Sequence, residues 1–131
     1  MVALDTVRIF LFLTLSPLLM RLQLASVSTL VSRPVRRQTP DPGRVARTIR
    51  LIDLMTRFGR PFIVPGCLTR GLALHYFLRR LGLDVALVFG DGKVNDQFAA
   101  HCWLERDNEP YLEKVNPHSH FVPVYRFGNA L

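Results

Sequence analysis

The chain has 131 residues, 49% of them hydrophobic and 21% charged, so it can bury a core as one domain and is not a disordered tail. Two cysteines allow at most one disulfide, which excludes a disulfide-built secreted scaffold and favours a reducing, cytoplasmic compartment. The net charge is +7, and the excess of positive charge lies in residues 1–80, which hold 13 arginines and three aspartates. Such a charge permits an anionic binding partner but does not exclude any class of reaction.

An apolar run without charge, IFLFLTLSPLLM, fills residues 9–20 between Arg8 and Arg21. A membrane span needs roughly 20 residues, and Asp5 before the run and Pro17 within it argue against a signal peptide. The apolar pattern then continues to residue 31 at roughly helical spacing. We therefore expect residues 1–32 to form a retained apolar helical segment that packs on the domain, with contact to a membrane or a partner as the alternative.

A stretch rich in Pro, Ser, Thr and Arg follows at residues 33–42 and is predicted to be a linker, which leaves residues 43–131 as the core of the domain. Its end is typical of a helix start, because Asp41 can cap free amides and Pro42 suits the first helical position. Apolar residues at helical spacing then predict a helix over residues 42–58.

The outer face of this predicted helix is rich in arginine. Such a face is usually only solvated, but it could also dock an acidic peptide. No aromatic residues interleave with these arginines and no nucleic-acid-binding motif is present, so nucleic acid is not expected as a partner. The candidate docking residues are Arg44, Arg47, Arg50 and Arg57.

A second helix is predicted from Cys67 to Leu81, with Gly82 as its stop. Short strand-like segments follow at residues 85–89, 99–105 and 110–115. A polar loop over 91–97 and a turn at 106–108 separate them, and residues from 117 onward are expected to form an irregular tail. Helices followed by a small antiparallel sheet predict an α+β domain.

Cys67 is the candidate nucleophile, since it stands at the start of the second predicted helix. Free amides and the helix dipole favour a thiolate at that position. Pro65 and Gly66 allow a tight turn that exposes the side chain, and the Cys67 amide could donate a hydrogen bond to an oxyanion. The alternative is a small, buried hydrophobic residue.

His101 is the candidate base. Side chains alternate along a strand, so His101 shares a face with Trp103, whereas Cys102 points to the opposite face and is predicted to lie in the core. Alone, His101 could be a satisfied core histidine, but a histidine that is paired with Cys67 favours nucleophilic catalysis.

A third group should orient the imidazole. A hairpin that turns near residues 107–108 would bring Glu113 alongside His101, with Asp96 and then Asp107 as rivals. A metal site is weakly indicated, because the chain has no C-x-x-C pair, and no phosphate-binding or dinucleotide-binding motif is present. We expect neither a metal nor a cofactor.

Four short motifs stand in order along residues 43–115: Gly66-Cys67-Leu68-x-Arg70, Leu78-Arg79-Arg80-x-Gly82, Val88-Phe89-Gly90 and Ala100-His101-Cys102-Trp103-Leu104-Glu105. Together they resemble the lasso peptide biosynthesis B2 proteins, which belong to the transglutaminase-like, papain-fold cysteine peptidase superfamily. Family members usually read Ala-His-Ala-Trp around the histidine, so Cys102 replaces a small residue.

The resemblance implies a cysteine peptidase with a transglutaminase-like fold that removes the leader from a lasso peptide precursor. Cys67 would be the nucleophile, and His101 would act as general base and then as general acid. The third family residue is usually an Asp on the strand after the histidine strand, and the matching position holds Glu113, which is one methylene longer.

The resemblance also implies partners. Fused relatives carry a leader-recognition domain before the protease, for which this chain has no room, so a separate B1-type leader-recognition protein is expected. The other partners would be the precursor leader peptide and an ATP-dependent lasso cyclase of the asparagine-synthetase type. The alternatives are a transglutaminase-like acyl transferase and a non-catalytic scaffold that holds the leader and the cyclase.

Overall fold

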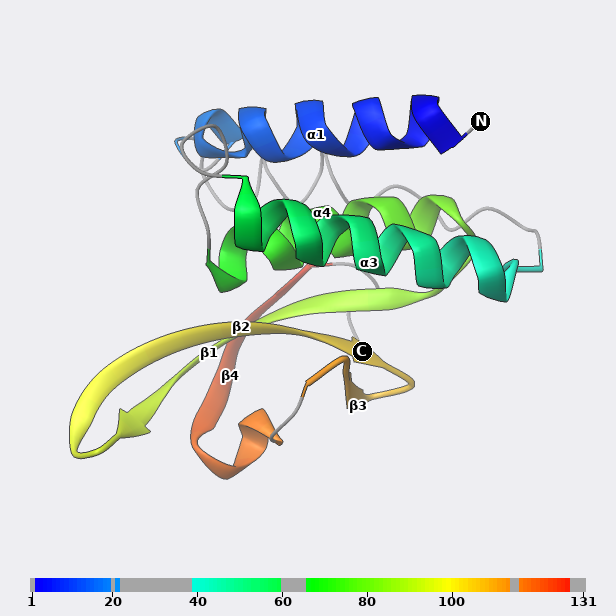
Figure 1. Ribbon diagram of the computed structural model, residues 1–131. Helices are drawn as coiled ribbons and strands as arrows, with labels where there is room; N and C mark the ends of the chain where they lie inside the picture. The colour runs from blue at the N-terminus through cyan, green and yellow to red at the C-terminus, as the bar shows by residue number, and fades with distance from the viewer. Residues whose placement is uncertain (1, 20, 22–38, 60–65, 114–115, 128–131) are drawn as a thin grey trace.

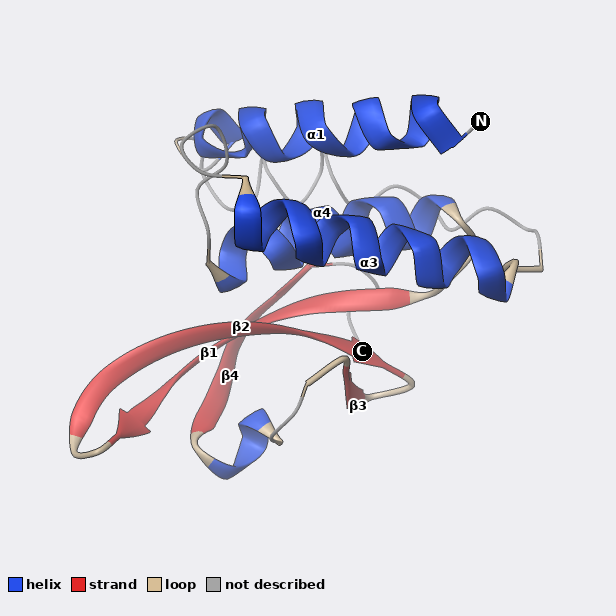
Figure 2. Ribbon diagram, viewed as in Figure 1, coloured by secondary structure: helices blue, strands red, loops and turns tan. Residues whose placement is uncertain are grey.

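The computed structural model describes residues 2–19, 21, 39–59, 66–113 and 116–127. Helix α1 (Val2–Leu19) lies over a pair of helices, α3 (Pro42–Phe58) and α4 (Cys67–Arg80), and this pair covers one face of an antiparallel sheet (Figures 1 and 2). In the described residues, three helices therefore precede a four-stranded sheet, which confirms the predicted α+β class.

Helix α1 runs over Val2–Leu19, so the apolar segment is helical as predicted and begins earlier than its uncharged run. Pro17 lacks the N–H that would bond the Leu13 carbonyl, and the Ser16 hydroxyl donates to that carbonyl instead at 2.8 Å. No described helix has both the length and the apolar character that crossing a bilayer requires. The continuation predicted over residues 22–32, and residues 33–38 of the linker, lie outside the described residues.

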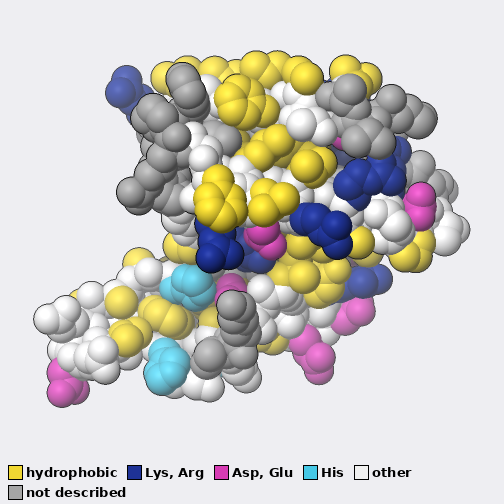
Figure 3. All heavy atoms as spheres, viewed as in Figure 1, with side chains coloured by type: hydrophobic (Ala, Val, Ile, Leu, Met, Phe, Trp, Pro, Cys, Tyr) yellow, Lys and Arg dark blue, Asp and Glu magenta, His cyan; other side chains and the backbone are white. Residues whose placement is uncertain are grey.

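One face of α1 belongs to the common core. Ile9 and Leu13 are fully buried with residues of α3, α4 and the sheet, and the Phe12 ring stacks on Tyr76 of α4 with ring centroids 4.9 Å apart. The opposite face is an exposed apolar ridge, visible along the upper edge of Figure 3. At least half of each ridge side chain is exposed; its members are Leu4, Val7, Leu11, Leu15 and Leu18.

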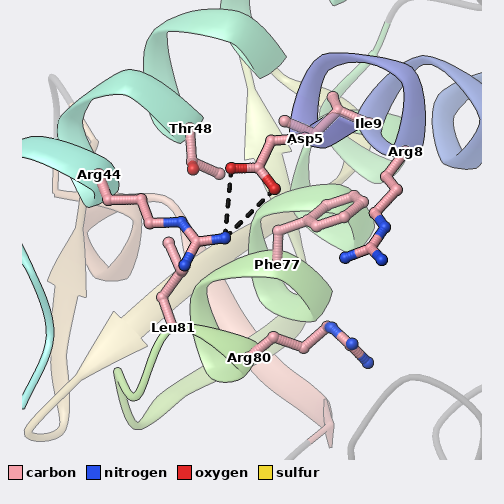
Figure 4. Close-up of a pocket in the computed structure, with 8 residues that line it drawn as sticks. All are labelled: Asp5, Arg8, Ile9, Arg44, Thr48, Phe77, Arg80 and Leu81. Atoms are coloured by element: carbon pink, nitrogen blue, oxygen red, sulfur yellow. Dashed lines mark hydrogen bonds and ion pairs between the residues drawn. The ribbon is translucent and has the colours of Figure 1, made fainter. Parts of the chain in front are cut away.

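An ion pair fastens α1 to α3. The Arg44 guanidinium donates to both Asp5 carboxylate oxygens at 3.2 Å, on the wall of a cavity of 220 Å³ that Arg8 and Arg80 also line (Figure 4). Arg44 therefore faces α1, and its side chain is 38% exposed.

Helix α3 spans Pro42–Phe58, as predicted. Asp41 caps it, because its carboxylate accepts a hydrogen bond from the Gly43 amide at 3.0 Å. Helix α4 spans Cys67–Arg80, close to the predicted bounds, and Arg70 in its first turn donates to Asp53 of α3 at 2.6 Å. The two helices thus hold the start of α4 against the middle of α3.

Strands β1 (Val85–Val94) and β2 (Gln97–Arg106) form a long curved hairpin whose tip extends past the helices (Figure 1). The prediction of a polar loop over residues 91–97 was wrong. Strand β1 continues to Val94 and β2 begins at Gln97, so only the two-residue turn Asn95-Asp96 joins them. Both turn residues have positive φ, at 53° and 62°, as a tight hairpin turn requires. Gly90 is a strand residue and not a turn, and a Cβ there would lie 2.6 Å from the Trp103 ring.

Strand β3 covers only Glu109–Tyr111, so the strand predicted over 110–115 ends early; Lys114 and Val115 of that strand lie outside the described residues. The predicted irregular tail was also wrong. It holds a short 3-10 helix, η1 (Pro117–Ser119), and strand β4 (Phe121–Phe127), which pairs with β1. Pro123 argues against a strand when the sequence is considered alone. A proline is tolerated here because β4 is an edge strand and its register with β1 shifts beside this residue.

Candidate active site

A cleft of 360 Å³ opens where α3, the first turn of α4 and strand β2 meet. Basic, acidic and histidine side chains gather along this junction of helices and sheet (Figure 3). The cleft lining combines two thiols, one imidazole, two carboxylates and two arginines, and it consists of Asp53, Thr56, Arg57, Gly66, Cys67, Arg70, Gly71, His101, Cys102, Trp103, Leu104 and Glu113.

Cys67 is the first residue of α4, is exposed and is a free thiol. Gly66 before it has a φ of +144°, a conformation that side-chain-bearing residues rarely adopt, so the chain enters the helix through a turn that favours glycine. The first amides of α4 have no carbonyl partner within the helix and point toward the start of the helix, where Cys67 stands.

The Cys67 thiol is strongly acidic. Hydrogen bonds lower the pKa of Cys67 to about 5, in first place the bond from the Cys102 thiol, then one from the Cys102 backbone amide and one from His101, while burial acts in the opposite direction. At neutral pH the Cys67 sulfur is therefore a thiolate that is held by three donors.

His101 lies on β2, and its Nε2 is 3.3 Å from Oε1 of Glu113. The imidazole stacks on Trp103 with ring centroids 5.9 Å apart and leans on Phe121 at 5.3 Å. These contacts hold the ring between the thiolate and the carboxylate, so the structure brings the three predicted residues, Cys67, His101 and Glu113, into one cleft.

Glu113 reaches His101 because β3 stops. In the β2–β3 register Leu104 faces Tyr111, and if this register continued, residue 113 would stand opposite Cys102 and share its face of the sheet. Leu112 instead adopts a φ of 64°, which ends the strand and turns Glu113 toward the histidine. Of the rivals, Asp96 lies in the β1–β2 turn and Asp107 in the β2–β3 turn; both are exposed, and neither lines the cleft.

Cys102 is buried, with 5% of its surface exposed, and belongs to the apolar core, as predicted. Strand alternation nevertheless missed its contact with Cys67. Hydrogen bonding from the Cys102 side chain and backbone and from the His101 side chain lowers the pKa of Cys67, and all three residues line one cleft, although the two strand residues point to opposite faces. Alternation along a strand predicts the face of each side chain and not its distance from a residue on another element.

The four candidate docking arginines separate in the structure. Arg44 pairs with Asp5, Arg47 and Arg50 are exposed along α3, and Arg57 lines the cleft itself. The Arg70–Asp53 ion pair on the cleft wall was not predicted; the spacing of two residues on different helices carries no sequence signal for such a contact.

A polar network supports the histidine on the face of β2 that His101 shares with Trp103 and Glu105. Glu105 is buried and accepts hydrogen bonds from Trp103 at 2.9 Å, Arg126 at 2.7 Å and His118 at 2.8 Å. Burial alone would raise the pKa of Glu105, but these donors outweigh it and lower that pKa. The network fixes the Trp103 ring on which His101 stacks.

A second hollow of 530 Å³ adjoins the cleft and shares Arg57, Arg70 and His101 with it. It continues toward η1 and the start of β4, where Phe121 and His120 line it. Among the described residues, no group of three or more His, Cys, Asp or Glu side chains is arranged to hold a metal ion.

The model of one protein family, the transglutaminase-like superfamily, matches residues 9–126, and the chain belongs to this family. The matched region begins inside α1, includes β1, β2 and β3, and ends at Arg126 within β4. No curated protein and no solved structure matches the chain.

Proposed function

We propose that this member of the transglutaminase-like superfamily is a cysteine peptidase that removes the leader from a ribosomally made lasso peptide precursor. The observation that carries the enzyme class is the cleft in which the acidic Cys67 thiol, His101 and Glu113 meet. The choice of substrate comes from the resemblance of the Gly66-Cys67 and His101-Trp103 motifs to lasso peptide B2 proteins.

The proposed reaction has two halves. The Cys67 thiolate attacks the carbonyl carbon of the bond between leader and core, and the first amides of α4 stabilise the oxyanion. Protonated His101 gives its proton to the leaving amine, so the core is released with a free N-terminus and the leader remains as a thioester. His101 then takes a proton from water, hydroxide adds to the thioester, and the leader leaves with a carboxylate.

Substrate delivery is proposed to come from a separate leader-recognition protein, with a lasso cyclase acting next. Arg47 and Arg50 on α3 are the exposed cationic positions for this docking, and both lie on the helix that leads to Arg57 in the cleft. Reversing both charges, Arg47→Glu and Arg50→Glu, should weaken complex formation in a pull-down with the recognition protein. Unchanged binding and processing would remove α3 from the proposed interface.

Acyl transfer to an amine is the second candidate, and the transglutaminase-like family match favours it. The same thiolate and imidazole would form the same thioester, and only the acceptor would differ, an amine in place of water. The acceptor depends on access to the cleft, which is open to solvent on the side of Cys67.

One experiment distinguishes these functions. The precursor is incubated with the recognition protein and this chain, either wild type or Cys67→Ala, and the products are weighed by mass spectrometry. Leader hydrolysis that is lost in Cys67→Ala supports the peptidase, whereas a mass gain from an added amine supports transfer. Equal processing of the precursor by wild type and by Cys67→Ala would contradict both the peptidase and the acyl transferase. The non-catalytic scaffold would then be the remaining function.

A further inference from the structure

Two free thiols lie in the cleft, and only one of them is needed as a nucleophile. Cys102 is on β2 with its side chain toward the helices, and its sulfur would be 3.6 Å from a Cβ built on Gly71, one helical turn after Cys67. A hydrogen bond joins the two cysteine side chains. The buried thiol is therefore placed beside the first turn of α4, within reach of the Cys67 sulfur.

The edge of β2 is open where this contact forms. Strand β3 covers β2 only as far as Leu104, and β1 occupies the other side, where Phe89 pairs with Cys102. Hydrogen bonding from the thiol and from the backbone amide of Cys102 lowers the pKa of Cys67. Cys102 thus offers Cys67 two donors, one from the backbone and one from the side chain.

The charges around the pair decide which sulfur keeps its proton. The hydrogen bond to the Cys67 side chain, then burial, and then the charges of Cys67 and Glu113 all raise the pKa of Cys102, and the Arg70 guanidinium opposes them only in part. Two adjacent sulfurs do not ionise together, because the second negative charge would be placed next to the first. Cys67 therefore carries the charge, and Cys102 stays a neutral S–H group that can donate.

We propose that Cys102 is a positioning residue for the nucleophile, whose thiol donates to the Cys67 sulfur and holds it at the edge of β2 beside His101. This inference rests on the proposed function, in which Cys67 is the nucleophile. It assigns to the thiol a role that an apolar core residue of the same size could not perform, because such a residue has no donor.

The test is the pH dependence of Cys67 alkylation by iodoacetamide, followed peptide by peptide in wild type, Cys102→Ala and Cys102→Ser. Loss of a hydrogen bond to a charged group should raise the Cys67 midpoint by about one pH unit or more in Cys102→Ala, which means roughly tenfold slower alkylation well below both midpoints. Cys102→Ser keeps a donor and should lie between the two. A merely structural role would change the melting temperature and leave this midpoint unmoved.

The outcomes separate the inference from the proposed function. An unchanged midpoint in folded Cys102→Ala overturns the positioning role and leaves Cys67 as the nucleophile. A wild-type midpoint in the ordinary range for a cysteine, near 8.5, contradicts the activated nucleophile itself. If Cys102→Ala does not fold, Cys102→Val supplies a second side chain without a donor, and the same midpoint decides.

Discussion

His101 Nε2 lies 3.3 Å from the Glu113 carboxylate, although His101 is on strand β2 and Glu113 lies beyond the end of strand β3. A carboxylate in this place fixes the imidazole tautomer and stabilises the imidazolium that forms during the reaction. The relationship depends on Leu112, whose left-handed backbone turns the chain toward His101.

Glu113→Gln should therefore act mainly on kcat and less on the free energy of unfolding. The amide keeps the size of the side chain but cannot stabilise the imidazolium, so we expect kcat to fall roughly 10²–10⁴-fold. Leader cleavage rates at saturating precursor measure this effect. Asp107→Asn is the matched control, because Asp107 lies in the exposed β2–β3 turn, away from the cleft. Equal rates for Glu113→Gln and wild type would remove Glu113 from the site.

Gly66→Ala should destabilise the fold and misplace the nucleophile. A Cβ at Gly66 would meet nothing within 4 Å, so the expected penalty of about 1–3 kcal/mol comes from the backbone, whose φ is +144°. Gly43→Ala is the control, since its Cβ would make only an ordinary contact, 3.5 Å from Asp41 Oδ1. Chemical unfolding measures both. Equal free energies of unfolding for Gly66→Ala and Gly43→Ala would contradict the backbone strain that is expected at position 66.

His75 should make the protein sensitive to mild acid. Burial, assisted by the Arg79 charge, lowers the pKa of His75 to about 3. An unfolded chain binds this proton below about pH 6.5, whereas the folded chain does not, so stability should fall by up to ~1.4 kcal/mol per pH unit between those values.

Urea unfolding at several pH values between 7 and 4 tests this expectation with the variant His75→Gln. The variant should lose less stability than wild type as the pH falls. His120→Gln is the control, because His120 is exposed. Parallel curves for wild type and His75→Gln would show that another group causes any acid sensitivity.

Glu105→Gln should cost about 2–4 kcal/mol, since it leaves the Arg126 guanidinium without the charge of its buried partner. The depressed pKa of Glu105 adds a pH signature: its contribution is full above the ordinary carboxyl pKa and is lost as the pH falls toward the lower folded pKa. This window begins at a lower pH than that of His75 and overlaps its acidic part. Thermal unfolding measures the effect, with the exposed Glu109→Gln as control. If Glu105→Gln is as stable as wild type, the stabilising role of the hydrogen-bond network around Glu105 is contradicted.

Local chemistry was sufficient to predict the helices. Asp41 and Pro42 start α3, and Gly66 starts α4, because capping and backbone freedom involve neighbours in sequence. The strands of the sheet were harder to predict than the helices. Polar residues 91–97 resemble a loop, but they form the exposed end of a hairpin, and Pro123 hid an edge strand whose pairing partner lies more than 30 residues earlier.

The sequence by itself determined which residues could do chemistry: a cysteine at a helix start, a histidine in a strand and an acid beyond the next turn. Only the tertiary structure decided how they meet. Strand alternation assigns Cys102 and His101 to opposite faces, yet both line the same cleft as Cys67 and both lower the pKa of its thiol. Such a contact joins groups far apart in the chain, so it depends on how helix and sheet pack and not on any local pattern.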